Sequence, residues 1–251
     1  MKVLCVIPAR MGSTRFPGKP LKKILGIPMI ERVYKNIYNS KLISKTIIAT
    51  CDDEIYNFAS SFGAPCLMTS NRHVRASDRC SEAVDILEKD YKESYEIILM
   101  VQGDEPLINT KMIDQSLLPF FNDKKIQVAN LLGKINNEEE FNDQNCIKVV
   151  CDNFKNALFF SRQAIPTLKS PNYPFYGKQV CVIPFRRDFL KIYNQLSPTM
   201  HEQNESIDML RILEHGFSVK MIPTSENTQA VDTLEDLQKV ERIISNIEKI
   251  N

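Results

Sequence analysis

The first hundred residues alternate short apolar runs with stretches of helical spacing, and this alternation limits the folds that the chain can adopt. Strands are predicted over residues 2–7, 46–50, 64–68 and 96–101, and helices over 29–40, 54–62 and 78–87. Strands that are apolar throughout, rather than at every second residue, are typical of a parallel sheet covered on both faces. The pattern therefore predicts a doubly wound α/β core.

The second half of the chain is less regular. Strands are predicted over residues 127–132, 146–151, 157–161 and 179–183, helices over 187–195, 205–214 and 236–250, and a proline-rich loop over 168–177. Since no internal repeat or linker interrupts the sequence, we expect one domain over residues 1–251, in which the second half adds a sheet insertion to the core.

Composition and charge exclude several classes of protein. The 251 residues carry 32 Lys and Arg against 31 Asp and Glu, whereas a general nucleic-acid binder is expected to be basic. No apolar stretch approaches the roughly 18–20 residues of a membrane span, and the apolar run at the N-terminus is too short for a signal peptide. The seven cysteines form no C-x-x-C pair. We therefore expect a cytoplasmic protein without disulfides or a zinc site.

A cationic loop follows the first predicted strand. Residues 8–21 contain Arg10, Arg15 and Lys19, with Gly12 and Gly18 between them. Glycine permits tight turns and close backbone approach, and arginine and lysine bind phosphate oxygens. A solvated basic loop is the alternative, but ligands of doubly wound sheets lie beyond the carboxyl ends of the strands. The loop therefore indicates an anion-binding site, although its spacing differs from that of a P-loop.

Two acidic motifs are candidates for a metal site. Asp104 and Glu105 follow the most apolar strand, where a carboxylate could hold Mg²⁺ against a triphosphate, although an acidic turn explains them equally well. Further along, Thr233 and Asp236 have the spacing of a helix N-cap. Asp232 precedes that cap and has no such structural explanation, so it is a candidate for the second metal carboxylate.

These motifs and three shorter stretches occur in the order found in one known family. The matching stretches are residues 7–21, 101–107, 147–150, 157–162 with 165–166, and 231–237. The chain resembles the nucleotide-sugar cytidylyltransferases, most closely those that act on 3-deoxy-manno-octulosonate (Kdo). The resemblance implies a mixed, mostly parallel sheet of the nucleotide-diphospho-sugar transferase type, with a small inserted dimerisation subdomain and therefore a homodimer. It also implies Mg²⁺-dependent transfer of CMP from CTP to an acidic sugar with release of pyrophosphate.

The resemblance further implies a role for individual residues. The catalytic set comprises Lys19, Arg10, Asp104 and Asp232, and the two aspartates would hold Mg²⁺. The nucleotide would be bound by Pro8, Ala9, Arg10, Arg15, Lys19, Ala76, Ser77, Arg79 and Gln102. The acceptor would be bound by Arg75, Gln102, Arg162, Gln179, Ile183, Asp208 and Met209.

The acceptor end departs from the family pattern. Gln179 replaces a histidine, Ile183 a tyrosine, Met209 a glutamine and Arg75 a serine. Because a site built to hydrogen-bond hydroxyls discriminates strongly, losing two polar partners predicts poor Kdo turnover. Arg75 would favour an acceptor with an additional negative charge if it points inward, and the alternative is a surface arginine paired with Asp78.

Three functions are therefore carried forward. The first is CMP transfer from CTP to a Kdo-like sugar acid, and the second uses another anionic acceptor, such as a different 2-keto-3-deoxy sugar acid or a phosphonate. The third, from another class, is an inactive nucleotide-binding relative that acts as a regulatory or scaffold subunit. The intact Arg10, Lys19, Asp104 and Asp232 argue against the third.

Overall fold

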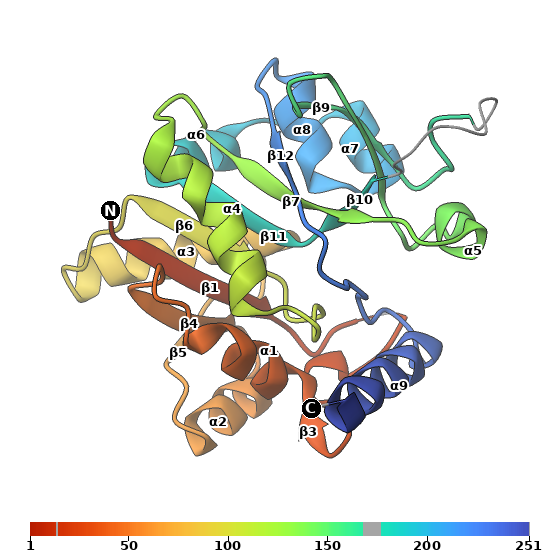
Figure 1. The fold of residues 1–251 in the computed structure, drawn as a ribbon. Coiled ribbons are helices and arrows are strands. Elements are labelled where there is room, and N and C mark those ends of the chain that lie inside the picture. Colours follow the sequence, from red (N-terminus) through yellow and green to blue (C-terminus); the bar gives the residue numbers. More distant parts are fainter. Residues whose placement is uncertain (14, 168–176, 251) are drawn as a thin grey trace.

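The computed structural model of the chain describes residues 1–13, 15–167 and 177–250, which form two five-stranded sheets surrounded by helices (Figure 1). The proline-rich loop predicted over residues 168–177 lies, apart from Gly177, outside the described residues. No helix in the described part of the chain is long and apolar enough to cross a membrane.

The larger sheet has the strand order β11-β6-β1-β4-β5. Its strands are β1 (Val3–Ala9), β4 (Lys45–Thr50), β5 (Cys66–Met68), β6 (Ile97–Val101) and β11 (Val182–Arg186). The first four run parallel, and β11 pairs antiparallel with β6 at the edge. The prediction of a doubly wound, mixed and mostly parallel sheet is confirmed.

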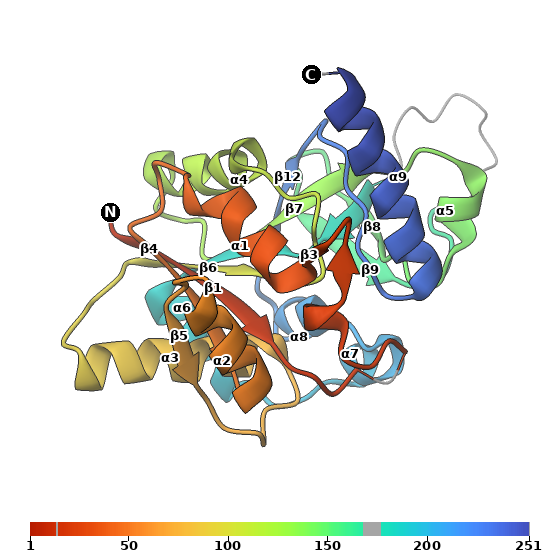
Figure 2. The same ribbon diagram turned by 90° about the horizontal axis from the view of Figure 1, so that it is seen from below.

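Helices cover both faces of this sheet (Figure 2). They are α1 (Met29–Tyr38), α2 (Asp53–Ser61) and α4 (Thr110–Asn122) on one face, and α3 (Ala76–Asp90) and α6 (Arg187–Gln195) on the other. In β1, Leu4 and Val6 pack with α3 and α6, whereas Cys5 and Ile7 pack with α1 and α4. Successive side chains of a strand point to opposite faces, so a strand buried on both faces is apolar at every position.

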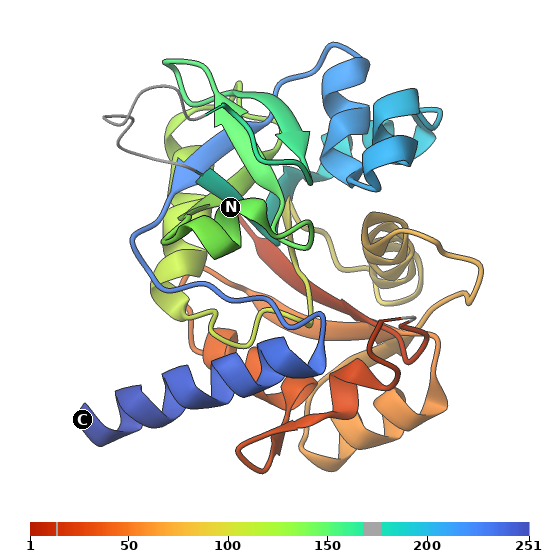
Figure 3. The ribbon, with the colours of Figure 1, turned by 90° about the vertical axis from the view of Figure 1, so that its right-hand side faces the viewer.

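The smaller sheet has the strand order β12-β7-β10-β8-β9. Its green and blue strands lie in the upper part of Figure 3. Its strands are β7 (Ala129–Lys134), β8 (Lys148–Cys151), β9 (Ala157–Ser161), β10 (Gly177–Val180) and β12 (Lys220–Pro223). The short helices in the second half of the chain are α5 (Glu138–Asn142), α7 (Met200–Glu205) and α8 (Asp208–Glu214). One hydrophobic cluster includes Leu4 of β1 and Phe160 of β9. This shared core favours the prediction of a single domain.

The C-terminal helix α9 (Leu234–Ile250) packs against the N-terminal part of the chain (Figure 1). Its Val240 and Ile244 share a small core with Ile24 and Met29, next to the hairpin of β2 (Lys23–Ile24) and β3 (Ile27–Pro28). The N-cap predicted from Thr233 and Asp236 is confirmed, because the Asp236 amide donates to Thr233 Oγ1 and the Thr233 amide to Asp236 Oδ2. This packing holds the start of α9 close to the cationic loop.

The single strand predicted over residues 179–183 is wrong. The chain leaves the smaller sheet after β10 and enters the larger sheet as β11, with Cys181 between them. The Cys181 amide donates to Glu105 Oε1 at 3.0 Å, and its carbonyl accepts from the Gln102 amide at 3.0 Å. Since the turn after β6 supplies both partners, the break depends on tertiary contacts that no local pattern reveals.

The helix predicted over residues 205–214 is also wrong at its start. Helix α7 ends at Glu205, Ser206 adopts a left-handed conformation with φ of 53°, and α8 begins at Asp208. The sequence analysis did not predict α4, α5 or β12. Helix α4 contains an internal proline, Pro119, and continues past it to Asn122, although proline usually interrupts a helix interior.

Candidate active site

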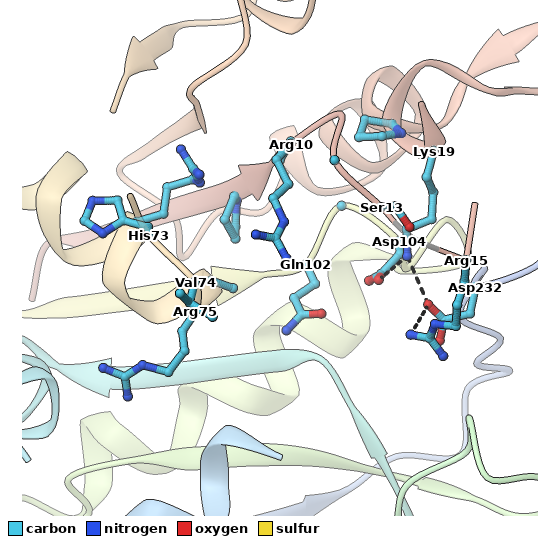
Figure 4. Close-up of a pocket in the computed structure, with 17 residues that line it drawn as sticks. Arg10, Ser13, Arg15, Lys19, His73, Val74, Arg75, Gln102, Asp104 and Asp232 are labelled. Atoms are coloured by element: carbon cyan, nitrogen blue, oxygen red, sulfur yellow. Dashed lines mark hydrogen bonds and ion pairs between the residues drawn. The ribbon is translucent and has the colours of Figure 1, made fainter. Parts of the chain in front are cut away.

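The loops after β1 and β6 and the segment before α9 meet at a cavity of about 300 Å³ (Figure 4). It lies beyond the carboxyl ends of the parallel strands, where doubly wound sheets bind their ligands. Its lining residues are Pro8, Ala9, Arg10, Gly12, Ser13, Arg15, Lys19, Pro20, His73, Val74, Arg75, Ala76, Arg79, Gln102, Gly103, Asp104 and Asp232. The sequence-predicted nucleotide residues are therefore brought together, with the exception of Ser77, which is fully buried and lines neither this cavity nor the adjoining one.

Two glycines shape the loops of this site. Gly18 has φ of 69°, a left-handed conformation in which it begins the 3₁₀ turn η1 (Lys19–Leu21) that carries Lys19. At Gly103, a Cβ atom would lie 3.2 Å from the side chain of Ile30 and 3.7 Å from the Pro8 carbonyl. Gly12, which the sequence analysis grouped with Gly18, has open space around it, so close backbone approach does not explain that glycine.

Lys19 lies between the two candidate metal carboxylates. Its ammonium donates to Asp104 Oδ2 at 2.8 Å and to Asp232 Oδ1 at 3.1 Å. Burial lowers the Lys19 pKa, but the two carboxylates outweigh burial and leave that pKa above its usual value. The Val231 amide donates to the Asp104 carbonyl at 2.9 Å, which places Asp232 beside Asp104. The two aspartates, which are far apart in the sequence, therefore lie close together in the structure.

Asp104 keeps one carboxylate oxygen available. Its Oδ1 atom is buried and has no hydrogen-bond partner among the described residues. The guanidinium of Arg15 pairs with the Asp232 carboxylate (Oδ1) at 3.0 Å and also donates to the side chain of Asn145. A buried oxygen that lacks a protein donor, next to a second carboxylate, has the chemistry of an incomplete cation site.

Glu105 has a different role from its neighbour Asp104. Its side chain is buried and accepts the Cys181 amide, so it holds the junction between β10 and β11. Burial, together with the nearby Asp104 carboxylate, raises the pKa of Glu105 to about 7. The sequence indicated an acidic turn or a metal site for this pair. The structural explanation applies to Glu105, which bonds to the chain after β10, and the metal site remains a candidate role for Asp104, which lines the cavity.

The far end of the smaller cavity is formed by the segment before α3 and its first turn. His73 Nε2 lies 2.6 Å from Glu82 Oε2, which also accepts the Ser70 amide at 2.7 Å. Arg79 is almost fully buried and donates to Thr69 Oγ1 and to the Ser70 carbonyl. These contacts fix the segment that carries Val74, Arg75 and Ala76 on the cavity wall.

A larger cavity of about 640 Å³ adjoins the first. The residues that line both are Arg10, Arg15, Val74, Arg75, Ala76, Gln102, Asp104 and Asp232. All the residues predicted to bind the acceptor line this cavity: Arg75, Gln102, Arg162, Gln179, Ile183, Asp208 and Met209. The structure therefore places the predicted acceptor set beside the predicted phosphate-binding set.

Several polar groups of the larger cavity are already engaged within the protein. The guanidinium of Arg162 donates to the carbonyls of Gln144, Glu205 and Ser206 at 2.7–3.2 Å. The side-chain amide of Gln179 (Nε2) donates to Asn130 Oδ1 at 2.7 Å. These bonds hold the two side chains in fixed orientations along the cavity wall.

The apolar members of the predicted acceptor set belong to the core. Ile183 and Met209 line the larger cavity but are almost fully buried within the same hydrophobic cluster. Neither residue therefore offers a side-chain hydrogen-bonding group, although the family pattern has such side chains at both positions.

Arg75 combines features of both alternatives considered for it. Its Nε and Nη2 atoms donate to Asp78 at 3.1 Å and 2.5 Å, as the ion-pair alternative predicts. Its side chain is nevertheless only 12% exposed, lies over the Tyr193 ring at 5.1 Å, and lines both cavities. Burial raises the pKa of the nearby Asp208 to about 6, while Arg75 opposes that shift.

Sequence reasoning missed several residues around the larger cavity. Asn145 is the partner of Arg15, and the buried Lys178 pairs with Glu140 and donates to the Thr228 carbonyl at 2.8 Å. Lys148 is fully buried in β8. The available signal was a lysine inside an apolar strand, which is rare unless its charge is compensated.

Comparison with known proteins gives a consistent result. A family model described as cytidylyltransferase matches residues 4–236. The chain is 40% identical over 240 residues to a 3-deoxy-manno-octulosonate cytidylyltransferase from Fusobacterium nucleatum subsp. nucleatum, covering 96% of each chain. It is 37% identical over 244 residues to the enzyme of that name from Syntrophus aciditrophicus, covering 97% of each.

A solved structure extends this similarity to the fold. CMP:2-keto-3-deoxy-manno-octonic acid synthetase, in complex with CTP, superposes with a TM-score of 0.87 at 34% identity. The match covers 98% of this chain and 99% of that one, so it includes both sheets and both cavities.

Proposed function

The chain belongs to the cytidylyltransferase family, and from that premise we propose that it transfers CMP from CTP to Kdo with release of pyrophosphate. The proposal rests on one observation: the Lys19 ammonium lies between the carboxylates of Asp104 and Asp232. Both aspartates also line the second, larger cavity. One cavity suits the nucleotide and the other suits a small anionic acceptor.

The nucleotide belongs in the smaller cavity in this proposal. Arg10, Arg15 and Lys19 bind the triphosphate, and the backbone at Pro8 and Ala9, with the start of α3, reads the base. An acceptor oxygen attacks the α-phosphorus, and the bond from that phosphorus to the bridging oxygen of the β-phosphate breaks. Such an in-line displacement depends on positioning and charge neutralisation more than on a protein nucleophile.

The donor set fits Mg²⁺ as the metal. Among the described residues there is no group of three or more His, Cys, Asp or Glu side chains that could enclose a metal ion. Magnesium usually takes only one or two protein carboxylates and completes its coordination with phosphate oxygens and water. Asp104, whose Oδ1 has no protein donor, and Asp232 would hold it. When bound, the metal would supply charge neutralisation on the phosphates.

The residues of the chain supply the remaining chemistry. Lys19 can exchange its two carboxylate partners for phosphate oxygens, since an ammonium on a flexible stem is a movable charge. Arg15 brings a forked donor to the same end of the cavity. The acceptor lies against Gln102 and Arg162, and the hydrogen bonds of Arg162 to backbone carbonyls fix its orientation.

A different anionic acceptor is the second candidate. Ile183 and Met209 line the cavity without a side-chain hydrogen-bonding group, so hydroxyl groups of Kdo would lose hydrogen bonds there. Arg75 lines the same cavity and favours an acceptor with an additional negative charge, such as a phosphonate. Relatives named for Kdo support the first candidate.

We also propose a homodimer in the cytoplasm. Strand β9 is an edge strand, on which Leu158 is 61% exposed, with the exposed Phe154 and Met200 in the segments around it. An apolar edge of this kind favours pairing with a second copy. Light scattering should therefore give twice the mass of one chain, and Leu158→Lys should reduce that mass.

The seven free cysteines fit a reducing compartment such as the cytoplasm.

The experiment that tests the function is pyrophosphate release from CTP and Mg²⁺ with and without an acceptor. Kdo, a second 2-keto-3-deoxy sugar acid and a small phosphonate are compared at saturating CTP. Release with Kdo at a kcat/KM of about 10⁵ M⁻¹s⁻¹ or more supports the first candidate. Faster turnover of another acceptor supports the second, and CTP binding without any release would identify an inactive relative.

A further inference from the structure

Lys148 is a buried lysine whose charge is compensated by backbone carbonyls. Its ammonium donates to the carbonyls of Asp143 and Cys146 at 2.6 Å and of Arg162 at 2.7 Å. An ammonium has three donors, and all three are used here. No carboxylate of the described residues forms an ion pair with it. Burial lowers the pKa of Lys148, and the more distant Asp143 and Glu205 carboxylates oppose that shift.

The three carbonyls come from two segments that line the larger cavity. Residues 143–147 connect α5 to β8, and Arg162 directly follows β9. The 143–147 loop also carries Asn145, the partner of Arg15, and its Gln144 carbonyl accepts from Arg162 Nη1 at 3.0 Å. One buried ammonium therefore joins the loop that orients Arg15 to the segment that carries Arg162.

We propose that Lys148 is a positioning residue that fixes Arg15 at the phosphate end and Arg162 at the acceptor end of the site. The inference rests on the proposed function, because it assigns these arginines to the two substrates. Without the ammonium, three partly buried carbonyls lose a donor, and among the described residues only that of Asp143 keeps a second one, the Cys146 amide at 3.2 Å. The loop must then move to find water or other donors. A displacement of about 1 Å in a substrate-positioning group can lower the rate by roughly a hundredfold.

The first test compares Lys148→Met with Lys220→Met. Lys220 makes a matched control, because its ammonium also donates to a backbone carbonyl, that of Phe154. This contact joins β12 to the turn between β8 and β9, and neither residue lines either cavity. In Lys148→Met we expect the KM for the acceptor to rise at least about tenfold and the CTP dissociation constant at least about threefold. Lys220→Met should leave both values unchanged.

A double-mutant cycle separates positioning from simple loss of stability. If Lys148 acts on CTP through Asn145 and Arg15, Lys148→Met should weaken CTP binding by less than about twofold when Asn145→Ala is already present. Effects that multiply in full would overturn the proposal. So would a Lys148→Met protein with a lower melting temperature but unchanged CTP affinity and unchanged acceptor KM.

If Lys148→Met does not fold, Lys148→Arg replaces it, because a planar guanidinium cannot direct three donors from one nitrogen and should raise the acceptor KM as well. Unchanged constants in that variant contradict the proposal. If the unmodified protein does not turn over any acceptor, the proposed function fails, and calorimetry with CTP alone still decides the role of Lys148.

Discussion

The strand ends of the larger sheet and the wall of the smaller sheet present their polar groups in different ways. At the larger sheet, Lys19, Asp104 and Asp232 contact one another across an open cavity, and Asp104 Oδ1 has no partner among the described residues. At the smaller sheet, Arg162 and Gln179 are already bonded to backbone carbonyls or to a buried amide. The first region can exchange its partners for ligand charges, and the second is a pre-formed surface.

This difference predicts different effects of substitutions in the two regions. The side chains expected to bind a ligand are only partly buried, so removing one should affect activity far more than stability. Side chains that are bonded within the protein are part of the fold, so removing one should affect both. Four substitutions test whether the two regions differ in this way.

The largest effect is expected from Asp104→Asn. An amide keeps the shape but loses the charge that would hold a cation, so turnover should fall at least about a hundredfold, roughly 3 kcal/mol in the barrier. Because the Asp104 side chain is partly exposed, the melting temperature should stay close to that of the unmodified protein. Asp53→Asn, at the exposed start of α2, is the control and should keep full activity.

Glu105→Gln tests the junction between the two regions through pH. The folded protein binds the Glu105 proton with a pKa of about 7, above the usual value of 4.5, so between those values it holds more protons than the unfolded chain. Its unfolding free energy should therefore fall as pH rises through this window, by roughly 3 kcal/mol from this group.

Denaturant unfolding of both proteins at pH 5 and pH 8 measures that contribution. The glutamine variant still accepts the Cys181 amide but does not ionise, so it should gain stability over the unmodified protein at pH 8 and not at pH 5. An equal difference at both pH values would mean that Glu105 does not titrate in this range.

Lys19→Ala is expected to lower turnover at least about tenfold, or about 1.4 kcal/mol, because a charge-assisted contact to the triphosphate is lost. The melting temperature should change little. Lys22→Ala removes a nearby exposed lysine that lines neither cavity and serves as the control. Turnover like that of the unmodified protein would remove Lys19 from the site.

The smallest effect on activity is expected from Gln179→Ala. The change leaves the buried Asn130 Oδ1 without its donor, which should lower the unfolding free energy by about 1 kcal/mol. The KM for the acceptor should rise while that for CTP stays the same. Loss of activity without loss of stability would contradict the contrast between the two regions, and exposed Gln203→Ala should change neither.

Local patterns in the sequence were sufficient for the four parallel strands of the larger sheet and the loops that follow β1 and β6. The strands were apolar at every position because helices cover both faces, and that pattern survives in any packing that buries them. Arg10, Arg15, Lys19 and Asp104 follow such strands directly, so the carboxyl ends of parallel strands place them at one edge. Asp232 was identified because its neighbours had a capping role and it had none.

Tertiary structure decided the rest. Nothing local distinguishes Cys181 as the point where the chain changes sheets, since Glu105 and Gln102 supply its partners from another strand end. The apolar periodicity and the charged loops depend on neighbours along the chain, so they can be predicted from the sequence alone. Where each charge finds its partner, as Lys148 does among three carbonyls, depends on segments that meet only in the folded protein.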